Sequence, residues 1–339
     1  LKMILSIIVP IYNGEKFILR CLNSLKNQNL DDGLFEIIAI NDGSTDRSLS
    51  ILSSLIKNNE NIRLIDQNNK GLGATRNIGI EAAKGKYIYF LDVDDYLAND
   101  VLKPLIQCIS TNKLDVLTFK TQVTDSGDLT QSNNSNFSIQ QVNVVDGYQY
   151  ISENNYRNEA WWYIIDLEFL KKTGFQFPEG VWMEDSIFTT KLFLAAHRIA
   201  FLPIDAHRYI NVSNSILNKK DSKHFIKVIY DTVPVIEEYE KIINELPKNS
   251  FTKRCIKRLR TRQQSFVFFL IIRIYKSDLK YSQMKDILKR TKGANAYPLN
   301  SFIGDEYNRV IYYPLTFIFN SPLLLRLSFM GYRFLRRLK

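Results

Sequence analysis

Apolar and polar positions alternate with two different periods along the first 120 residues. Short apolar runs occupy 5–9, 35–40, 62–65, 87–91 and 115–119, and each has the length of a buried strand. The stretches between them carry apolar residues at every third or fourth position, which is the period of a helix packed on one face. Strands that alternate with helices in this way predict an α/β fold with a mostly parallel sheet flanked by helices.

The helices of this part have recognisable limits. We expect them over 17–25, over 74–84 and near 101–109. Another helix is expected after Ser44, whose hydroxyl is a suitable N-cap, and it continues to Leu55.

Composition changes twice further along the chain. Residues 121–143 are rich in Ser, Thr, Asn and Gln, which favours a surface loop, whereas 148–203 is aromatic and structured. Residues 1–220 contain 22 Lys and Arg against 25 Asp and Glu, but 221–339 contain 23 against 10 and have a helical pattern. We therefore expect a near-neutral domain over 1–220 and a basic helical region over 221–339, whose charge suits an anionic membrane, a nucleic acid or no partner.

The three cysteines exclude two kinds of site. Cys21, Cys108 and Cys255 lie far apart without a CxxC spacing, which argues against a disulfide framework and a structural zinc site. A reducing compartment fits best. No signal peptide is expected, because no small-residue cleavage site follows the first apolar run.

Polar residues follow each of the first four strands where the strand ends. These segments are 10–13, 41–44, 66–69 and 92–95. In an open parallel sheet the carboxyl ends of the strands share one edge, and ligands bind there. Turns favour Asn, Asp and Gly in any case, but four such segments along one edge indicate a ligand site.

Three of these residues form a dense acidic cluster. Asp92, Asp94 and Asp95 fall within four positions at the end of a buried strand, where their carboxylates repel one another. A divalent cation would neutralise them, and Mg²⁺ or Mn²⁺ prefers such oxygen ligands and keeps positions open for nucleotide phosphates. The alternative is a solvated acidic turn or a helix cap.

Two later segments add charged candidates. The run 71–76 begins like a dinucleotide fingerprint, but Arg76 stands where the third glycine belongs, so we discard that interpretation. Arg76 could bind an anionic ligand or pair with a nearby carboxylate. Glu184 and Asp185 precede an apolar helix over 187–196; one of them could cap it and leave the other free to act as a base.

Together these motifs closely resemble the inverting family-2 glycosyltransferases with the GT-A fold, of the kind that build bacterial surface polysaccharides. The similarity covers roughly residues 4–216. The motifs that carry it are Val9-Pro10-Ile11-Tyr12-Asn13, Asn41-Asp42-Gly43-Ser44-Thr45-Asp46, Gly71 through Arg76-Asn77, Asp92-Val93-Asp94-Asp95, Trp162 to Phe169, and Phe177-Pro178-Glu179-Gly180 to Glu184-Asp185.

The resemblance implies a hexosyltransferase that uses a nucleotide sugar, commonly a UDP-sugar, and inverts the anomeric centre. It implies a donor half over about 1–120 and an acceptor half over about 144–220. Asp185 would be the general base, and Asp94 with Asp92 would bind Mn²⁺ or Mg²⁺. The residues that would hold the donor are Pro10, Tyr12, Asn13, Asp42, Arg76 and Asp92.

One departure from the family pattern concerns the end of this region. Similar sequences often place Arg after the Tyr that precedes a Ser-Ile pair, but Ile210 follows Tyr209 here. His207 and Arg208 lie just upstream and are candidates to substitute in a phosphate or metal role. Glu184, beside the expected base, is a further candidate.

The basic region ends in a segment suited to a membrane surface. Residues 310–325 carry no charge, but Pro314 and Pro322 interrupt them and they are short for a spanning helix. With the basic residues of 333–339 at headgroup level, they suit an interfacial segment on anionic lipid. The alternative is a helical cap with a solvated basic face.

Membrane contact would make the saccharide acceptor a lipid-linked one, for example on polyprenyl diphosphate. It would place the enzyme in the cytoplasm, peripherally on the inner face of the bacterial cytoplasmic membrane.

Two other functional classes stay open at this point. A sugar-phosphate nucleotidylyltransferase also uses an α/β sheet and a metal, although its usual glycine-rich start is absent. A catalytically inactive membrane- or nucleic-acid-binding protein is the other class. We expect no nucleic-acid partner, because acidic strand ends in a near-neutral domain would repel phosphates.

Overall fold

The computed structural model describes residues 3–133, 138–211, 222–304 and 306–338. The chain forms two compact units, Leu1–Tyr150 with Arg157–Ser215, and Ile151–Tyr156 with Ile216–Lys339. The domain boundary expected after residue 220 lies outside the described residues, as does the Ser215-Ile216 pair.

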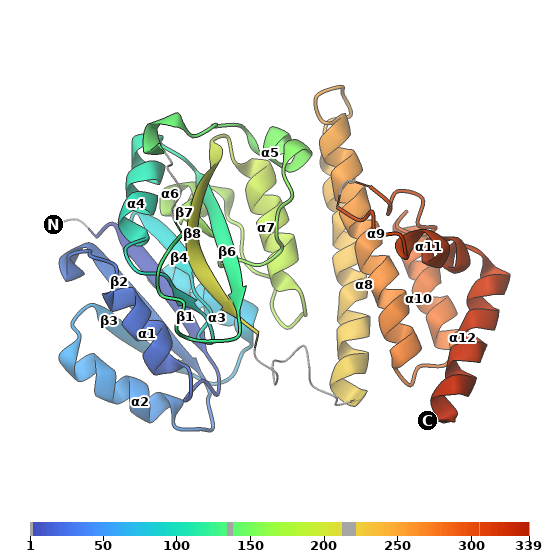
Figure 1. Ribbon diagram of the computed structural model, residues 1–339, viewed down its shortest axis with the longest axis horizontal. Coiled ribbons are helices and arrows are strands. Elements are labelled where there is room, and N and C mark those ends of the chain that lie inside the picture. Colours follow the sequence, from blue (N-terminus) through green and yellow to red (C-terminus); the bar gives the residue numbers. More distant parts are fainter. Residues whose placement is uncertain (1–2, 134–137, 212–221, 305, 339) are drawn as a thin grey trace. The chain divides into compact units, whose positions relative to one another are not determined.

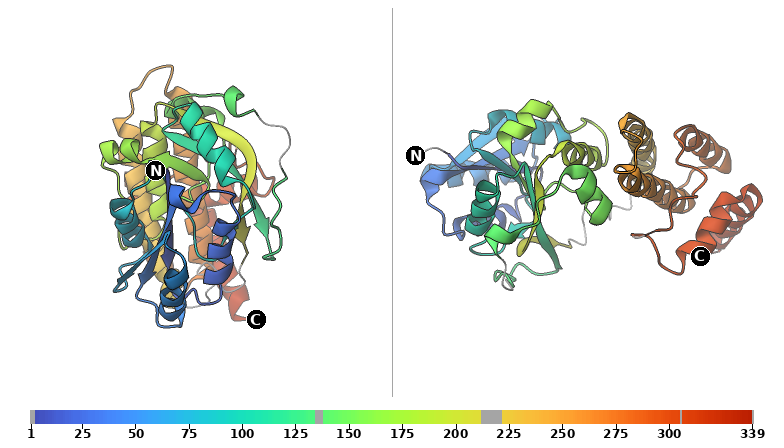
Figure 2. Two further views of the ribbon diagram at one scale, coloured as in Figure 1. Left: turned by 90° about the vertical axis from the view of Figure 1, so that its left-hand side faces the viewer. Right: turned by 90° about the horizontal axis from the view of Figure 1, so that it is seen from above.

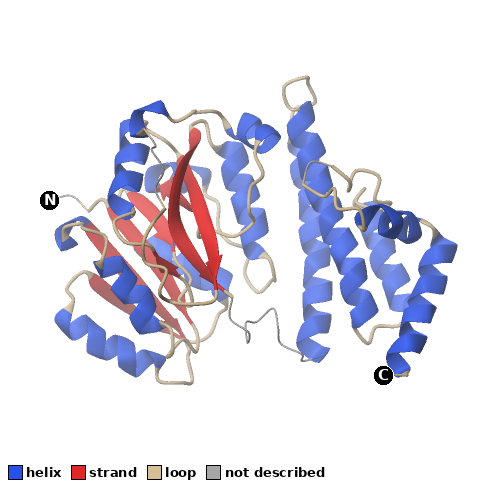
Figure 3. Ribbon diagram, in the orientation of Figure 1, coloured by secondary structure: helices blue, strands red, loops and turns tan. Residues whose placement is uncertain are grey.

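The first unit is built on one sheet of eight strands (Figures 1 and 3). Their order is β3-β2-β1-β4-β7-β6-β8-β5. The first four strands of that order are parallel, β7 is antiparallel to both neighbours, β6 and β8 are parallel, and β5 is antiparallel to β8. The strands are β1 (Leu5–Ile11), β2 (Phe35–Asp42), β3 (Ile62–Gln67), β4 (Tyr87–Phe90), β5 (Tyr96–Leu97), β6 (Val116–Thr124), β7 (Tyr163–Asp166) and β8 (Ile199–Ile210).

Helices cover both faces of this sheet (Figure 3). Alternate residues of β1 point to opposite faces, so Ile7 and Val9 join the core beneath α1 and α4, whereas Ile8 meets α3. Gly79 of α3 makes this contact possible, because a Cβ there would lie 2.3 Å from Ile8 Cγ2. The helices are α1 (Ile18–Lys26), α2 (Ser48–Leu55), α3 (Leu72–Ala82), α4 (Leu102–Thr111), α5 (Gly147–Glu153), α6 (Leu167–Thr173) and α7 (Glu184–Ala195), with short 3₁₀ turns at Asp32–Leu34, Ile56–Asn58 and Ile139–Gln141.

The expected fold class is confirmed, and three local predictions need correction. Ser44 is not an N-cap: α2 begins at Ser48, and the Ser44 hydroxyl accepts a hydrogen bond from the Asn13 N–H. The expected loop of 121–143 begins later, because β6 extends to Thr124 beside β8. The helix expected from residue 187 begins at Glu184, one turn earlier.

The second unit is helical, as expected. Figure 2 shows α8 and α9 packed side by side, with the shorter helices against them. Some of its basic side chains form ion pairs within the unit. Arg258 and Arg262 both pair with Glu306, and Arg260 pairs with Glu240. The helices are α8 (Ser222–Glu245), α9 (Lys253–Lys276), α10 (Tyr281–Gly293), α11 (Tyr312–Asn320) and α12 (Pro322–Arg337).

Of the helices in the described ranges, none is both long and apolar enough to cross a membrane.

Candidate active site

The polar ends of β1 to β4 lie side by side, as the sequence predicts. Register pairs Ile11 with Asn41, and Asn41 in turn with Asp66. The Asn41 amide donates a 2.7 Å hydrogen bond to Asp66 Oδ1 across this edge. On the other side of β1, Ile8 pairs with Phe90, the last residue of β4. The loops that follow these strands therefore open onto one edge of the sheet.

Asn13 fastens the loop after β1 to the loop after β2. Its backbone is left-handed, with φ +52°, a conformation that Asn tolerates better than most residues. The Asn13 N–H donates to Ser44 Oγ at 3.0 Å, and Asn13 Oδ1 accepts from the Thr45 N–H at 2.8 Å. Pro10 is buried in β1, whereas the Tyr12 side chain is 51% exposed and free to meet a ligand.

Asp42 shapes the loop that follows β3. Its carboxylate accepts hydrogen bonds from the Gln67 amide and the Lys70 N–H, both at 2.8 Å, and from the Gly71 N–H at 3.0 Å. Asp42 is buried, so these three donors supply the hydrogen bonds that water would otherwise provide. In this structure the Asp42 carboxylate fixes the entry to α3.

The carboxylates of the acidic cluster after β4 lie close together and repel one another. Burial, with the carboxylates of Asp95 and Asp92, raises the pKa of Asp94 to about 7. The Arg20 guanidinium lies close, but its 2.6 Å hydrogen bond goes to the Asp94 carbonyl and not to the carboxylate. Asp95 is fully buried and accepts a 2.9 Å hydrogen bond from the Ile210 N–H.

This acidic cluster suits a cation whose remaining coordination positions are filled by a bound ligand. No group of three His, Cys, Asp or Glu residues in the described ranges is arranged to hold a metal ion. The Asp94 carboxylate nevertheless has two acidic neighbours and no cation paired with it among the described residues. A hard divalent cation commonly uses one or two carboxylates with phosphate oxygens and waters, so the donor set fits such an ion once phosphates are present.

Arg76 is the buried cation at the centre of the site. Its guanidinium donates to Asp92 Oδ1 and to Glu184 Oε1, both at 2.9 Å. It also lies over the Phe177 ring, 5.2 Å from the centroid. Burial lowers the pKa of Arg76, but the three carboxylates of Asp92, Glu184 and Asp185 more than offset this and raise it overall. Arg76 is therefore charged and joins the end of β4 to the start of α7.

The segment before α7 is held tightly against α3. The Asn77 amide donates to the Phe177 carbonyl at 2.9 Å, and Asn77 Oδ1 accepts from the Phe177 N–H at 2.8 Å. Gly73 allows the close approach, because a Cβ there would lie 2.4 Å from the Pro178 carbonyl oxygen. Met183 then turns the chain into α7 in a left-handed conformation, with φ +67°. These contacts fix where Glu184 and Asp185 point.

Asp185 is the partly exposed acid of this pair. Burial and the neighbouring Glu184 carboxylate raise the pKa of Asp185 to about 8, against the lowering effect of Arg76. Within the described part of the chain, no donor hydrogen bonds to the Asp185 carboxylate. Glu184 is buried, and burial also raises its pKa, although Arg76 opposes this. The arrangement leaves Glu184 as the anchored carboxylate and Asp185 as the available one.

The two candidates on β8 have different surroundings. His207 is stacked on Trp161 with centroids 4.3 Å apart, and burial lowers the pKa of His207 to about 3. Its Nε2 lies 3.2 Å from Asp95 Oδ2. The Arg208 guanidinium donates to the carbonyls of Leu129 and Gln131 and to Asp205 Oδ1. Arg208 thus fastens the loop after β6 to β8.

Sequence reasoning missed three residues that shape the site. Asn77 lies in the family motif but has no role assigned from it, Arg20 looks like one more polar residue of α1, and Glu159 carries no motif. Glu159 adds to the raised pKa of Asp185. Only Asn77 had a usable signal, since it follows Arg76 directly in the family motif.

Comparison with models of known protein families shows which family the chain belongs to. The model of glycosyl transferase family 2 matches residues 6–188, which are 183 of the 339 residues. The chain belongs to glycosyl transferase family 2. The match runs from β1 into α7 and so contains the polar ends of β1 to β4, together with Asp185.

Curated relatives of this transferase are bacterial glycosyltransferases. It is 34% identical to the glycosyltransferase EpsJ of Bacillus subtilis over 217 residues, which cover 63% of this chain and 62% of EpsJ. It is 32% identical to the poly(ribitol-phosphate) β-N-acetylglucosaminyltransferase TarS of Staphylococcus aureus over 210 residues, 60% of this chain and 35% of TarS. The chain thus matches less than two thirds of the length of either relative.

Solved structures show the same fold. S. aureus TarS in complex with UDP-GlcNAc superposes with a TM-score of 0.62 at 21% identity, covering 88% of this chain and 89% of that one. The mannosyltransferase PcManGT of Pyrobaculum calidifontis, in complex with GDP-Man and Mn²⁺, gives 0.55 at 13% identity over 97% and 88%. The chain therefore has the GT-A fold, and of the three functional classes considered its family is that of the glycosyltransferases.

Proposed function

We propose that this transferase moves a sugar from a nucleotide sugar, specifically a UDP-sugar, to an acceptor hydroxyl with inversion at the anomeric carbon. The observation that carries the proposal is the Arg76 bridge. It holds Asp92, at the donor edge of the sheet, and Glu184, next to Asp185, on one guanidinium. Donor and base would therefore lie within a single polar cluster.

The donor would bind along the carboxyl ends of β1 to β4. Tyr12 is exposed there and can stack on a nucleobase, with Pro10 and Asn13 shaping the loop beneath it. Asp42 would contact the nucleoside through lone pairs beyond those that hold Lys70 and Gly71. Arg76 supplies positive charge close to the diphosphate. The UDP complexes of TarS support the choice of a uridine nucleotide.

Asp94 and Asp92 would hold the divalent cation, Mn²⁺ or Mg²⁺, together with phosphate oxygens of the donor. The bound ion would stabilise negative charge on the leaving diphosphate. The acid cluster supports this assignment, because Asp94 is crowded by like charges that a cation would relieve. A phosphate or metal role for His207 and Arg208 stays a prediction; the Arg208 contacts give that residue a structural part.

Asp185 would act as the general base. A carboxylate with a raised pKa accepts a proton more strongly than an ordinary Asp, which suits it to take the proton of the acceptor hydroxyl. The acceptor oxygen would then attack the anomeric carbon on the face opposite the diphosphate, so the configuration inverts in one displacement. Glu184, held by Arg76, would keep Asp185 in place.

The acceptor would be a saccharide of a surface polymer, carried on a lipid such as polyprenyl diphosphate. The names of relatives support a polymer-directed enzyme, since TarS is named for poly(ribitol-phosphate). We place the transferase in the cytoplasm, peripherally on the inner face of the bacterial cytoplasmic membrane, with 221–339 as the contacting region. Capsule or related polysaccharide synthesis is the corresponding pathway class.

Thermal unfolding with UDP-, GDP-, CMP- and dTDP-sugars tests the donor assignment, because a ligand that binds the folded state raises its stability. We expect a UDP-sugar to raise the unfolding temperature in Mn²⁺ and to lose most of this effect in EDTA. The Asp94→Asn variant should lose the Mn²⁺-dependent part. Stabilisation by a different nucleotide, or none by any, would contradict the proposal.

A further inference from the structure

Helix α12 presents apolar side chains on two opposite faces. On one face, Phe329 packs between Tyr275 and Tyr281, with ring centroids 5.3 and 5.7 Å away. The opposite face carries a stripe at positions i, i+4, i+7 and i+11, which a helix aligns along one side. Its members are Leu323, Leu327, Met330 and Phe334, which keep 66, 56, 55 and 65% of their surface exposed.

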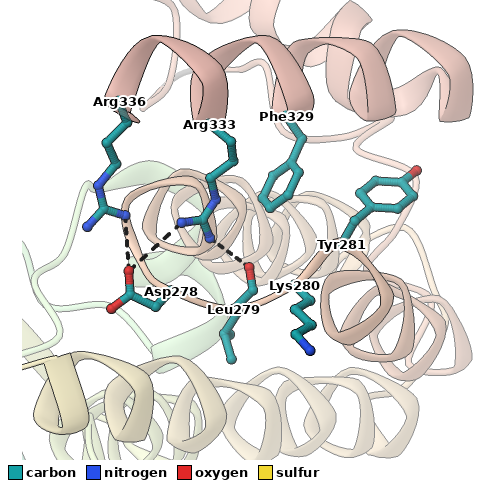
Figure 4. A pocket seen from close by; sticks show the side chains of 7 residues that line it. All are labelled: Asp278, Leu279, Lys280, Tyr281, Phe329, Arg333 and Arg336. Atoms are coloured by element: carbon teal, nitrogen blue, oxygen red, sulfur yellow. Dashed lines mark hydrogen bonds and ion pairs between the residues drawn. The ribbon is translucent and has the colours of Figure 1, made fainter. Parts of the chain in front are cut away.

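The arginines of α12 set which face points outward. Figure 4 shows the Arg333 and Arg336 side chains reaching from α12 toward Asp278. Arg333 donates to the Leu279 carbonyl at 2.6 Å and Arg336 to the Ser277 carbonyl at 3.0 Å, and both lie within 4 Å of Asp278 Oδ1. This differs from the arrangement expected from the sequence, in which these arginines lie at headgroup level. Because they turn inward, the apolar stripe turns outward.

The neighbouring α11 extends the exposed apolar surface. Thr316 and Phe319 are buried, but Tyr313 and Phe317, spaced at i and i+4, are 55 and 71% exposed, and Val310 in the turn before the helix is 85% exposed. Helices α11 and α12 contact each other directly. We call Val310, Tyr313, Phe317, Leu323, Leu327, Met330 and Phe334 the apolar face. Seven large apolar side chains on two adjoining helices and the turn before them are more than an ordinary protein surface leaves uncovered.

We propose that the apolar face docks on an anionic lipid bilayer by inserting these side chains at the level of the headgroups and upper acyl chains. The proposal deepens the membrane contact proposed above and rests on it. Aromatic and aliphatic side chains on amphipathic helices bind bilayers in this way. The new element is that apolar insertion, oriented by the Arg333 and Arg336 contacts, provides the binding.

The positive charge around the apolar face favours an anionic lipid bilayer, and not a second copy of this chain, as its partner. Residues 307–339 contain six Lys and Arg and no Asp or Glu, and the region stays positively charged although Arg333 and Arg336 pair with one acid, Asp278. Two copies that paired through the apolar face would bring like charges together, which is unfavourable. An anionic bilayer offers the complementary charge, and Arg326, which is exposed beside the stripe, is placed to meet it.

Co-sedimentation of the full chain with vesicles of equal parts phosphatidylglycerol and phosphatidylcholine tests the proposal. We expect the Leu327→Ser/Phe334→Ser variant to partition at least about tenfold less than the wild type. A matched control, Leu19→Ser/Val123→Ser, alters similarly exposed apolar residues of the first unit and should bind as the wild type does. Part of the wild-type binding should persist at about 0.5 M NaCl, where purely electrostatic adsorption is screened.

Three results would overturn the proposal: no vesicle binding by the wild type, equal binding by the Leu327→Ser/Phe334→Ser variant, or a lipid-free dimer that this variant dissociates in sedimentation velocity. Thermal stabilisation by a UDP-sugar with Mn²⁺ separates this test from the proposed function. Wild type and both variants should be stabilised equally, so a wild type that is stabilised by the donor but does not bind vesicles contradicts only the docking surface. Absence of stabilisation in all three, with vesicle binding intact in the wild type, would contradict only the transferase proposal.

Discussion

The Arg76 guanidinium and the Glu184 carboxylate are joined by a 2.9 Å hydrogen bond although 108 positions separate them in the sequence. The same guanidinium holds Asp92 at the end of β4. One buried charge therefore couples the acidic strand end, where the donor is proposed to bind, to the helix that carries Asp185. The predictions below start from this connection.

Replacing Arg76 should damage the fold as well as the reaction. In Arg76→Met the side-chain volume is largely kept, but Asp92 and Glu184 lose their cation. Breaking a buried pair in this way costs about 3–5 kcal/mol, so we expect a clear fall in the unfolding temperature measured by calorimetry. Arg47→Met removes the exposed pair with Glu15 instead and should leave the unfolding temperature unchanged. Equal changes of the unfolding temperature in the two variants would show that the Arg76 bridge stabilises the fold no more than an exposed ion pair does.

The rate should depend on pH through Asp185. A general base works only when deprotonated, and the pKa of Asp185 is raised to about 8. We therefore expect kcat/KM to rise about tenfold per pH unit below this value and to level off above it. Glu184→Gln removes the neighbouring negative charge and should move the break to lower pH. A pH profile that is identical in this variant would contradict the electrostatic link between Glu184 and Asp185.

The acid cluster should cost stability when no metal is present. The folded-state pKa of Asp94 lies above its ordinary value, so the native state holds a proton that the unfolded state releases, and stability falls as pH rises from about 4 to 7. In EDTA at pH 7.5 or above, Asp94→Asn should raise the unfolding temperature by about 2–4 °C. With Mn²⁺ and donor the order should reverse. An Asp94→Asn variant that is less stable than the wild type in EDTA would refute this.

Asn77 should affect kcat through its two hydrogen bonds to the main chain of Phe177. Asn77→Leu removes two buried hydrogen bonds, which costs about 2 kcal/mol, and frees the segment that leads to Asp185. We expect lower stability together with lower kcat in a UDP-release assay. Asn112→Leu also removes two side-chain hydrogen bonds to main-chain carbonyls, but at the C-terminal end of α4, and should lower stability while keeping kcat. Unchanged kcat in Asn77→Leu would argue against a positioning role.

Local patterns explain why much of the first unit could be predicted. Strands β1 to β4 and their helices follow one another along the chain, so apolar period and turn residues define each of them. The sheet order beyond β4 could not be predicted, because β7 pairs with both β4 and β6, which are distant in sequence. The Ser44 error has a similar origin: its hydroxyl is occupied by Asn13, 31 positions earlier.

The candidate site, like the fold, could be predicted from the sequence only in part. Types of residue at the strand ends indicated a ligand edge and an acidic cluster, and the structure brings these residues together. The partners of Arg76 and of Arg333 could not be read from the sequence, because Glu184 and Asp278 reach them only through the tertiary fold. As a result, the outward apolar face of α12 was not foreseen in its observed orientation.

The most direct test of the proposed chemistry is to measure UDP-sugar binding and turnover in Asp185→Asn. If Asp185 is the general base, this variant should bind the UDP-sugar with an unchanged Kd in Mn²⁺ and lose about a thousandfold in kcat, since only proton removal is impaired. Turnover close to that of the wild type in a variant that still binds the donor would contradict the assignment of Asp185 and the mechanism built on it.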